Sequence, residues 1–95
     1  MNRDLFLACV ADPTRFALLE QLAAKDACVN DLVEATGQSQ SNISHHLKQL
    51  RECGFVDYQR DGKSNRYHLA HPEVAAFLAA ADRAAVALTG ACEVC

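Results

Sequence analysis

Residues 39–50 constrain this chain more than any other segment, because their apolar and polar side chains separate onto two faces of a helix. Ile43, Leu47 and Leu50 repeat at the spacing of a single helical stripe. The opposite face carries short hydrogen-bonding side chains and a lysine, whereas an ordinary exposed helix more often carries paired Glu and Lys. Such a face is suited to the major groove of DNA, where short polar groups can reach base edges.

The rest of the chain reads as further helices and one β-hairpin. Asp12-Pro13 and Ser39 are typical helix starts, Gly37 is a typical helix end, and Asp61-Gly62 indicates a tight hairpin turn. We expect helices at residues 3–10, 13–25, 30–36, 39–52 and 72–88, and strands at 55–58 and 64–69. The predicted fold class is mainly α with a small β-hairpin, a winged helix-turn-helix in a single domain over residues 1–95. Its recognition helix is expected at 39–52 and its wing at 55–69.

Charge is unevenly distributed along the 95 residues. The net charge is −3, but residues 39–68 carry +2 and the remainder carries −5. A basic surface on an acidic body is compatible with nucleic-acid binding. No apolar run approaches the roughly 18 residues of a membrane span, so we expect a cytoplasmic protein without a membrane partner. Five cysteines, an odd number, argue against a closed disulfide scaffold and favour free thiols, ligands or redox switches.

Three motifs together resemble the ArsR/SmtB family of metal-sensing repressors over nearly the whole chain. They are Ala-Asp-Pro-Thr-Arg-Phe-Ala-Leu-Leu at 11–19, Ser-Gln-Ser-Asn-Ile-Ser-His-His-Leu at 39–47, and Gly-Phe-Val-Asp-Tyr-Gln-Arg-Asp-Gly-Lys at 54–63. The resemblance implies a transcriptional repressor, not an enzyme, that leaves a two-fold symmetric DNA operator when an inducer binds. It also implies a homodimer built on residues 3–10 and 72–88. The eight alanines between Ala75 and Ala87 independently favour close approach of a second helix.

The expected DNA contacts fall into two groups. Side chains on the recognition helix are candidates for base edges or phosphates, whereas cations of the helix and wing are expected to contact phosphate. The candidates are Gln40, Ser41, Asn42, Ser44 and His45 in the first group, and Lys48, Arg60, Lys63 and Arg66 in the second. His46 is expected either to touch DNA or to face the body of the domain.

The sensor site departs from two patterns of the family. After His71 no histidine remains, so a zinc or nickel site of the usual type on the last helix is not expected. Where many arsenic and cadmium sensors have Cys-Val-Cys-Asp-Leu, residues 28–32 read Cys-Val-Asn-Asp-Leu, which leaves Cys28 as a weaker candidate. A third pattern of the family joins thiols at the end of the recognition helix to thiols of a C-terminal tail. It implies a site made of Cys53, Cys92 and Cys95.

Thiolates select soft ions, and three sulfurs suit arsenite or antimonite, with cadmium or lead also accommodated. The sequence leaves open whether the thiols come from one protomer or two. It also leaves open a thiol redox or persulfide sensor, a structural zinc module and a constitutive DNA-binding protein. Cys9, on the apolar side of the first helix, is interpreted as a small buried hydrophobic residue.

Overall fold

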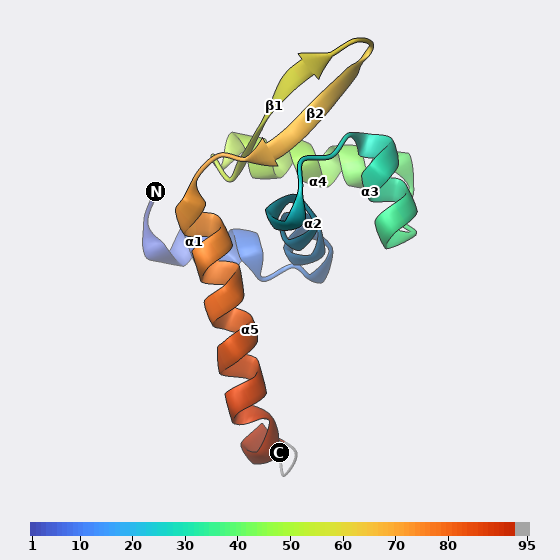
Figure 1. The fold of residues 1–95 in the computed structure, drawn as a ribbon. Helices are drawn as coiled ribbons and strands as arrows, with labels where there is room; N and C mark the ends of the chain where they lie inside the picture. Colours follow the sequence, from blue (N-terminus) through green and yellow to red (C-terminus); the bar gives the residue numbers. More distant parts are fainter. Residues whose placement is uncertain (93–95) are drawn as a thin grey trace.

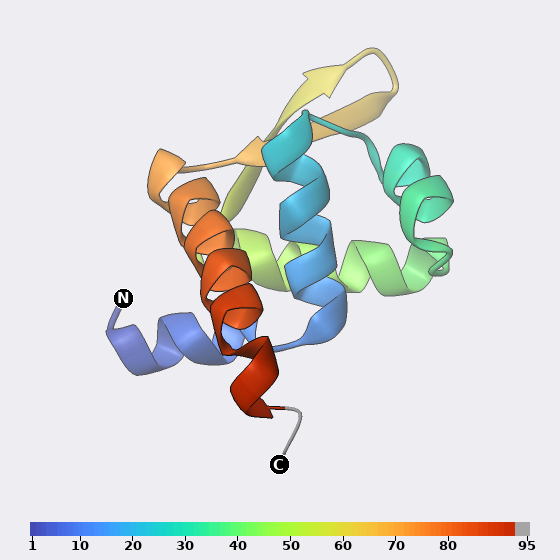
Figure 2. The same ribbon diagram turned by 60° about the horizontal axis from the view of Figure 1, so that its bottom comes forward.

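The computed structural model describes residues 1–92, with the side chains placed as far as residue 88. Five helices and one antiparallel hairpin follow one another along this part of the chain (Figure 1). They are α1 (Arg3–Val10), α2 (Pro13–Ala24), α3 (Val29–Thr36), α4 (Gln40–Glu52), β1 (Val56–Asp61), β2 (Ser64–Leu69) and α5 (Pro72–Cys92). This order confirms the predicted winged helix-turn-helix. Figure 2 shows α2, α3 and α4 gathered on one side and α1 with α5 on the other.

The helix boundaries follow the expected capping residues. The Asp12 carboxylate accepts hydrogen bonds from the backbone N–H groups of Thr14 and Arg15, and Pro13 occupies the first helical position of α2. The Ser39 hydroxyl accepts from the N–H of Asn42 and caps α4. Gly37 ends α3 with a φ of +73°, a left-handed conformation that glycine adopts without strain.

The hairpin is longer than expected, and its turn is displaced by one residue. β1 extends to Asp61, which pairs with Ser64, so the loop consists of Gly62 and Lys63. Gly62 has a φ of +63°, whereas Lys63 does not have a positive φ, a pattern of a type II′ turn. The predicted strand end at residue 58 and the predicted Asp-Gly turn are therefore wrong, because the loop begins one residue later in the chain and Gly62 occupies its first position. An isolated bridge between Ala27 and Tyr67 joins the hairpin to the α2–α3 connection.

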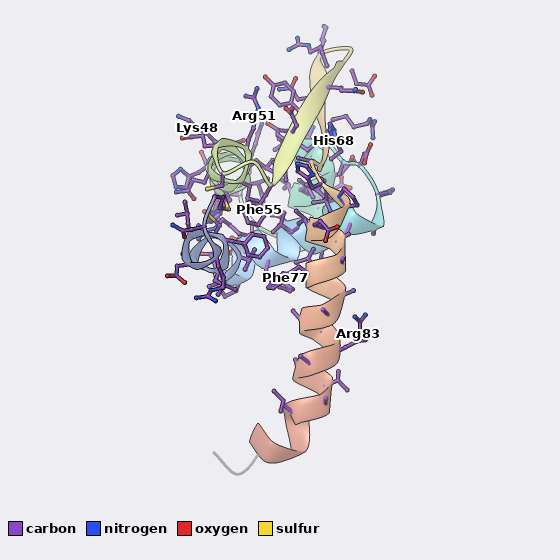
Figure 3. All side chains as sticks on the ribbon, turned by 90° about the vertical axis from the view of Figure 1, so that its left-hand side faces the viewer. Lys48, Arg51, Phe55, His68, Phe77 and Arg83 are labelled. Atoms are coloured by element: carbon purple, nitrogen blue, oxygen red, sulfur yellow. The ribbon has the colours of Figure 1, made fainter. Side chains whose placement is uncertain are left out.

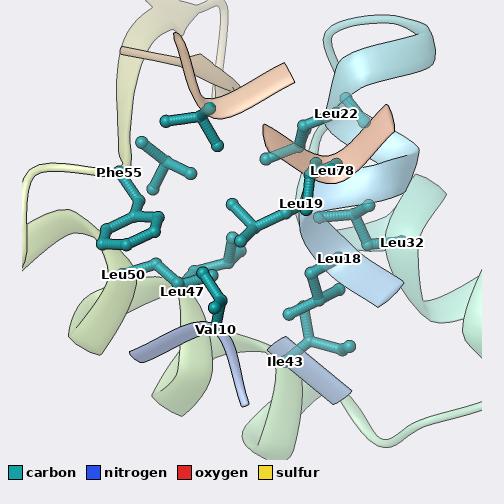
Figure 4. Close-up of a cluster of buried hydrophobic side chains, with 13 residues drawn as sticks. Val10, Leu18, Leu19, Leu22, Leu32, Ile43, Leu47, Leu50, Phe55 and Leu78 are labelled. Carbon is teal, nitrogen blue, oxygen red and sulfur yellow. The ribbon is translucent and has the colours of Figure 1, made fainter. Parts of the chain in front are cut away.

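One apolar core unites the helices with the base of the hairpin. Leu18 and Leu19 of α2 are fully buried, as are Ile43, Leu47 and Leu50 of α4 (Figure 4). The predicted stripe of the recognition helix is thus the face that fixes α4 to the domain. The other core residues are Val10, Leu22, Ala27, Leu32, Phe55, Val56, Val74 and Leu78.

α1 and the first two turns of α5 pack against this core. The Phe6 ring of α1 stacks on Phe55 and meets Phe77 of α5 edge to face, each at a centroid distance of 5.0 Å. Beyond Leu78, α5 runs away from the body of the domain (Figure 1). The predicted end of this helix at Thr89–Gly90 is wrong. The helix continues to Cys92, since an alanine-rich helix tolerates one glycine at a cost of about 1 kcal/mol.

None of the helices in the part that the structure describes is long and apolar enough to cross a membrane.

Candidate nucleic-acid interface and thiol site

The solvent face of α4 is the first candidate interface. Opposite its buried stripe, the side chains of Gln40, Ser41, Ser44, His45 and Lys48 are all exposed. In the described part of the chain, no ion pair involves Lys48. Five of the nine predicted DNA-contacting residues therefore lie together on one side of a single helix.

Asn42 and His46 differ from their neighbours on α4. Asn42 is half-buried, and its side-chain N–H donates to Oε1 of Gln38 at 2.8 Å, which ties the start of α4 to the preceding turn. Nδ1 of His46 is buried without a partner, and the imidazole lies near enough to Asp12 to lower the pKa of that carboxyl further. The larger cause of the lowered Asp12 pKa is the pair of hydrogen bonds that the carboxylate accepts from the backbone N–H groups of Arg15 and Thr14. His46 thus faces the domain body, one of the two orientations expected for it.

The wing carries the remaining predicted phosphate contacts, and its cations are not equivalent. Nε of Arg60 donates to the carbonyl of Gly62 at 2.9 Å, which folds this side chain over the turn. Nε and Nη2 of Arg66 both lie 3.1 Å from the Asp61 carboxylate. Lys63, at the tip, is exposed and belongs to no ion pair within the described residues. Lys63 is therefore the wing cation most available to an external phosphate.

A groove of about 630 Å³ separates α4 from the wing. Arg51 crosses one end of it, with its guanidinium 4.4 Å from the centre of the Tyr58 ring and 3.4 Å from the Asp57 carboxylate. Figure 3 shows Arg51 projecting from α4 beside the hairpin and Lys48 on the opposite side of the helix in this view. The groove is lined by Ser44, Lys48, Arg51, Glu52, Tyr58, Asn65 and Tyr67. The contacts of Arg51 thus link α4 to β1, and residues of the helix and the wing line the same groove.

A pair of thiols lies at the C-terminal end of α4. Sγ of Cys9, near the end of α1, donates to Sγ of Cys53 at 2.9 Å. Both residues are half-buried and face a pocket of about 270 Å³ between the two helices. Figure 3 views α1 and α4 nearly end-on, with sulfur atoms in the space between them. Burial raises the pKa of the Cys9 thiol, the neighbouring Cys53 adds to this effect, and Arg15 opposes it.

Arg15 organises this pocket. Its guanidinium donates to the carbonyls of Cys9 at 2.7 Å and Ala8 at 3.3 Å, at the end of α1. It also donates to Oε1 of Gln49, one helical turn before Cys53, at 3.2 Å. A cation at the C-terminus of a helix is favourable because it complements the helix dipole. One side chain of α2 therefore holds the end of α1 against the end of α4.

The other predicted thiols lie elsewhere. Cys28 caps the start of α3 and shares a pocket with Gln40 and Lys63, at the opposite end of α4 from Cys53. The 13 residues of α4 span about 20 Å, so Cys28 cannot share an ion with Cys53 of the same protomer. Residue 92 follows Leu78 by about 21 Å along α5, which leads away from α4 (Figure 1). The side chain of Cys92 and all of Cys95 lie outside the described residues.

Comparison with known proteins assigns the chain to a family. Residues 12–58, from the cap of α2 through the recognition helix to the first wing strand, match the model of the bacterial regulatory proteins of the arsR family. The chain belongs to the ArsR family. This confirms the resemblance seen in the sequence, and because the relatives are transcriptional regulators it also confirms that the chain is not an enzyme.

Similar proteins are found in several bacteria. A probable mercury resistance operon repressor from Streptomyces lividans is 41% identical over 70 residues, which are 74% of this chain and 56% of the relative. The chain spans little more than half the length of the first curated relatives that it matches. The crystal structure of Mycobacterium tuberculosis Rv0081 superposes with a TM-score of 0.84 at 34% identity, covering 98% of this chain and 93% of that one.

A second structural neighbour is described as a homodimer. The winged helix-turn-helix DNA-binding domain Mb0332 from Mycobacterium bovis superposes with a TM-score of 0.76 at 28% identity, covering 82% of this chain and 72% of that one. Its solution structure is that of a homodimeric domain and a possible ArsR-family regulator. The fold of this chain is therefore also that of a domain described as homodimeric.

The sequence does not indicate the thiol contact or the part played by Arg15. Cys9 and Cys53 are 44 residues apart, and nothing in the spacing of either residue indicates the other. In the sequence Arg15 is only part of a motif, although its place in the first turn of α2 puts a long cation beside the end of α1. Cys9 was predicted to be buried; it packs against the core but is only half-buried, and its thiol lies against a second thiol.

Proposed function

We propose that this chain is a homodimeric transcriptional repressor that binds operator DNA through α4 and the wing. On this proposal a soft metal ion or metalloid, held by cysteine thiolates, releases the repressor from DNA. Because its ligand is operator DNA, the protein acts in the cytoplasm.

The observation that carries the DNA-binding proposal is the division of α4 into two faces. Ile43, Leu47 and Leu50 are completely inaccessible to solvent, whereas the polar side chains on the other face are exposed. The first set fixes the orientation of the helix, and the second is free to contact base edges and phosphates. Lys48 and Lys63 add positive charge at two points of the same polar surface.

Exposed apolar side chains on α1 and on the outer half of α5 support the dimer. Leu5 and Leu7 of α1 are 51% and 44% exposed, and Val86 and Leu88 of α5 are 74% and 56% exposed. Side chains of this kind gain about 25 cal/mol for each Å² that a partner removes from water. A second copy paired through α1 and α5 would cover them and set two recognition helices about 34–36 Å apart, one turn of DNA.

The direct experiment is selection of bound duplexes from a random DNA library by the purified chain. We expect a two-fold symmetric site with half-site centres about one helical turn apart. Substituting His45 with Ala should change the preferred bases, while Lys63→Ala should weaken binding to all DNA sequences alike. Recovery of no preferred sequence, or of an asymmetric single site, would contradict the proposal.

For the inducer, Cys53 with Cys92 and Cys95 remains the proposed ligand set, and arsenite, antimonite, cadmium and lead are the proposed ions. Since α5 leads residue 92 away from α4 of its own protomer, such a set would combine Cys53 with the tail of the partner subunit. Cys92→Ser with Cys95→Ser should leave operator binding intact and abolish release by these ions, measured by fluorescence anisotropy. Cys28→Ser is the matched control, and unchanged release by the double variant would exclude the tail.

The contact between Cys9 and Cys53 favours a second candidate, a thiol redox or persulfide sensor of the same fold. Two thiols at 2.9 Å are placed to be linked by an oxidant or by a sulfur-transferring persulfide. Mass spectrometry after separate exposure to peroxide, persulfide and metal ions distinguishes the two mechanisms. A covalent link between these cysteines that releases DNA without metal would favour the redox sensor.

A further inference from the structure

We infer that Cys9 and Cys53 of one protomer form a two-thiolate site for a thiophilic cation of linear coordination, with Hg²⁺ as the probe. The site itself follows from contacts within the described chain. Its effect on DNA rests on the proposed function.

Three observations define the site. The two sulfurs, from different helices, already touch at 2.9 Å. They open onto a pocket of about 270 Å³ that is accessible from solvent, so an ion has room to enter. Besides the two cysteines, the pocket is lined by the apolar residues Ala8 and Leu50 and by the polar side chains of Arg15, Gln49 and Glu52.

The surroundings favour two ligands over three. Among the described residues, no group of three His, Cys, Asp or Glu side chains is close enough to hold an ion. The position one turn before Cys53 on α4 is Gln49, whose amide oxygen is engaged by Arg15. Arsenite and cadmium would therefore need a third sulfur from outside this set, whereas a soft ion that prefers two thiolates needs none.

Charge and proton balance are consistent with such an ion. Two thiols each lose a proton to solvent, and the two thiolates with Hg²⁺ form a neutral complex, with no change of oxidation state. A neutral complex suits a half-buried pocket, because no net charge is left to be desolvated. The Arg15 guanidinium beside the pocket stabilises the thiolates while the ion enters.

Binding would alter the junction between α1 and α4. Thiolate–metal bonds of about 2.3 Å hold two sulfurs up to roughly 4.6 Å apart when the ion is linear, compared with 2.9 Å in the free pair. The ends of the two helices must therefore separate. Gly54, with a φ of +83°, and Phe55, stacked on Phe6, follow Cys53 directly. The two helices would thus move apart at the point where α1, a helix of the proposed dimer interface, meets the end of the recognition helix α4.

The test uses the full chain with Cys28, Cys92 and Cys95 all changed to Ser, which retains only the pair. Under reducing, anaerobic conditions we expect one Hg²⁺ per protomer and two sulfur neighbours by X-ray absorption spectroscopy. Adding Cys9→Ser or Cys53→Ser should lower the affinity at least 100-fold in competition with a small dithiol. Circular dichroism and operator binding of each variant confirm that the fold is retained.

Mixing the Cys9→Ser and Cys53→Ser forms of this chain tests whether both sulfurs come from one protomer. A site within one protomer predicts no recovery of tight binding in the mixture, and recovery would overturn the inference. Equal affinity of the pair-only and single-thiol variants would also overturn it. Tight binding by the pair with operator affinity unchanged would support the site and contradict the proposed release mechanism instead.

Discussion

The outer face of α4 and the outer half of α5 are both exposed, but they differ in what they expose. α4 presents amide, hydroxyl, imidazole and ammonium groups above a fully buried stripe. α5 buries Val74 and Leu78, whereas Val86 and Leu88 further along are open to solvent. The first surface is complementary to a polyanion and the second to another apolar surface. The same small domain therefore has one face suited to DNA and another suited to a second copy of itself.

The largest effect expected is on the buried side of α4. Leu47→Ala should lower the free energy of unfolding by about 2–5 kcal/mol, because it leaves a cavity at a completely buried position. Ser44→Ala, one turn away on the exposed face, should stay within about 0.5 kcal/mol of the wild type. Urea denaturation measures both. Similar values for the two variants would show that α4 does not have the two distinct faces described here.

The outer half of α5 is tested by Leu88→Glu. A charge placed among apolar side chains should weaken dimerisation by at least tenfold, because a desolvated carboxylate would lack a partner. Sedimentation velocity over a concentration series measures the dissociation constant of the dimer. Ala35→Glu, on the exposed side of α3, is the control and should leave it unchanged. A dimer unaffected by Leu88→Glu would place the interface elsewhere.

The wing cations give a smaller effect. Lys63→Ala should reduce the slope of log affinity against log salt concentration by about one, as expected for loss of one phosphate contact. Arg66→Ala should reduce it less, because Asp61 already neutralises this guanidinium. Operator titrations at several salt concentrations compare the two. An equal loss for both would mean that Arg66 leaves Asp61 when DNA binds.

The smallest effect concerns the junction of α2 and α5. Burial and the neighbouring Asp82 carboxylate raise the pKa of Glu20. A carboxyl whose pKa is raised by folding makes the native state bind more protons, so stability falls as pH rises through its titration range. Glu20→Gln should therefore stabilise the chain at neutral pH, by less than about 1 kcal/mol for so exposed a pair, and not at pH 3. Thermal unfolding at both pH values checks this, with Glu34→Gln as control.

Local patterns were sufficient for most of the fold. The stripe at Ile43, Leu47 and Leu50, the Asp12 cap and the Gly37 end are set by neighbours in the sequence, and the structure has all of them as expected. The hairpin turn was misplaced because Asp-Gly and Gly-Lys are both acceptable turn pairs, and only the strand register chooses between them. The end of α5 was misplaced because one glycine was given more weight than the alanines before it.

The candidate sites also include residues that could be predicted from local sequence patterns and contacts that could not. Exposed residues of α4 could be predicted, since helical periodicity alone separates them from the core. The Cys9–Cys53 contact could not, because it depends on how α1 crosses the end of α4. Long-range contacts determine that crossing, from Phe6 to Phe55 and from Arg15 to Gln49. Pairing of Arg66 with Asp61 likewise depends on the side-chain conformations across the hairpin, so counting cations overstates the charge available to DNA.

Operator binding by a dimer is tested most directly by hydroxyl-radical footprinting of the reduced protein on a selected duplex, combined with the mass of the complex. We expect two chains on one duplex, with two protected regions about one helical turn apart on the same side of the DNA. A single chain protecting one region, or no protection on any duplex recovered by selection, would contradict it.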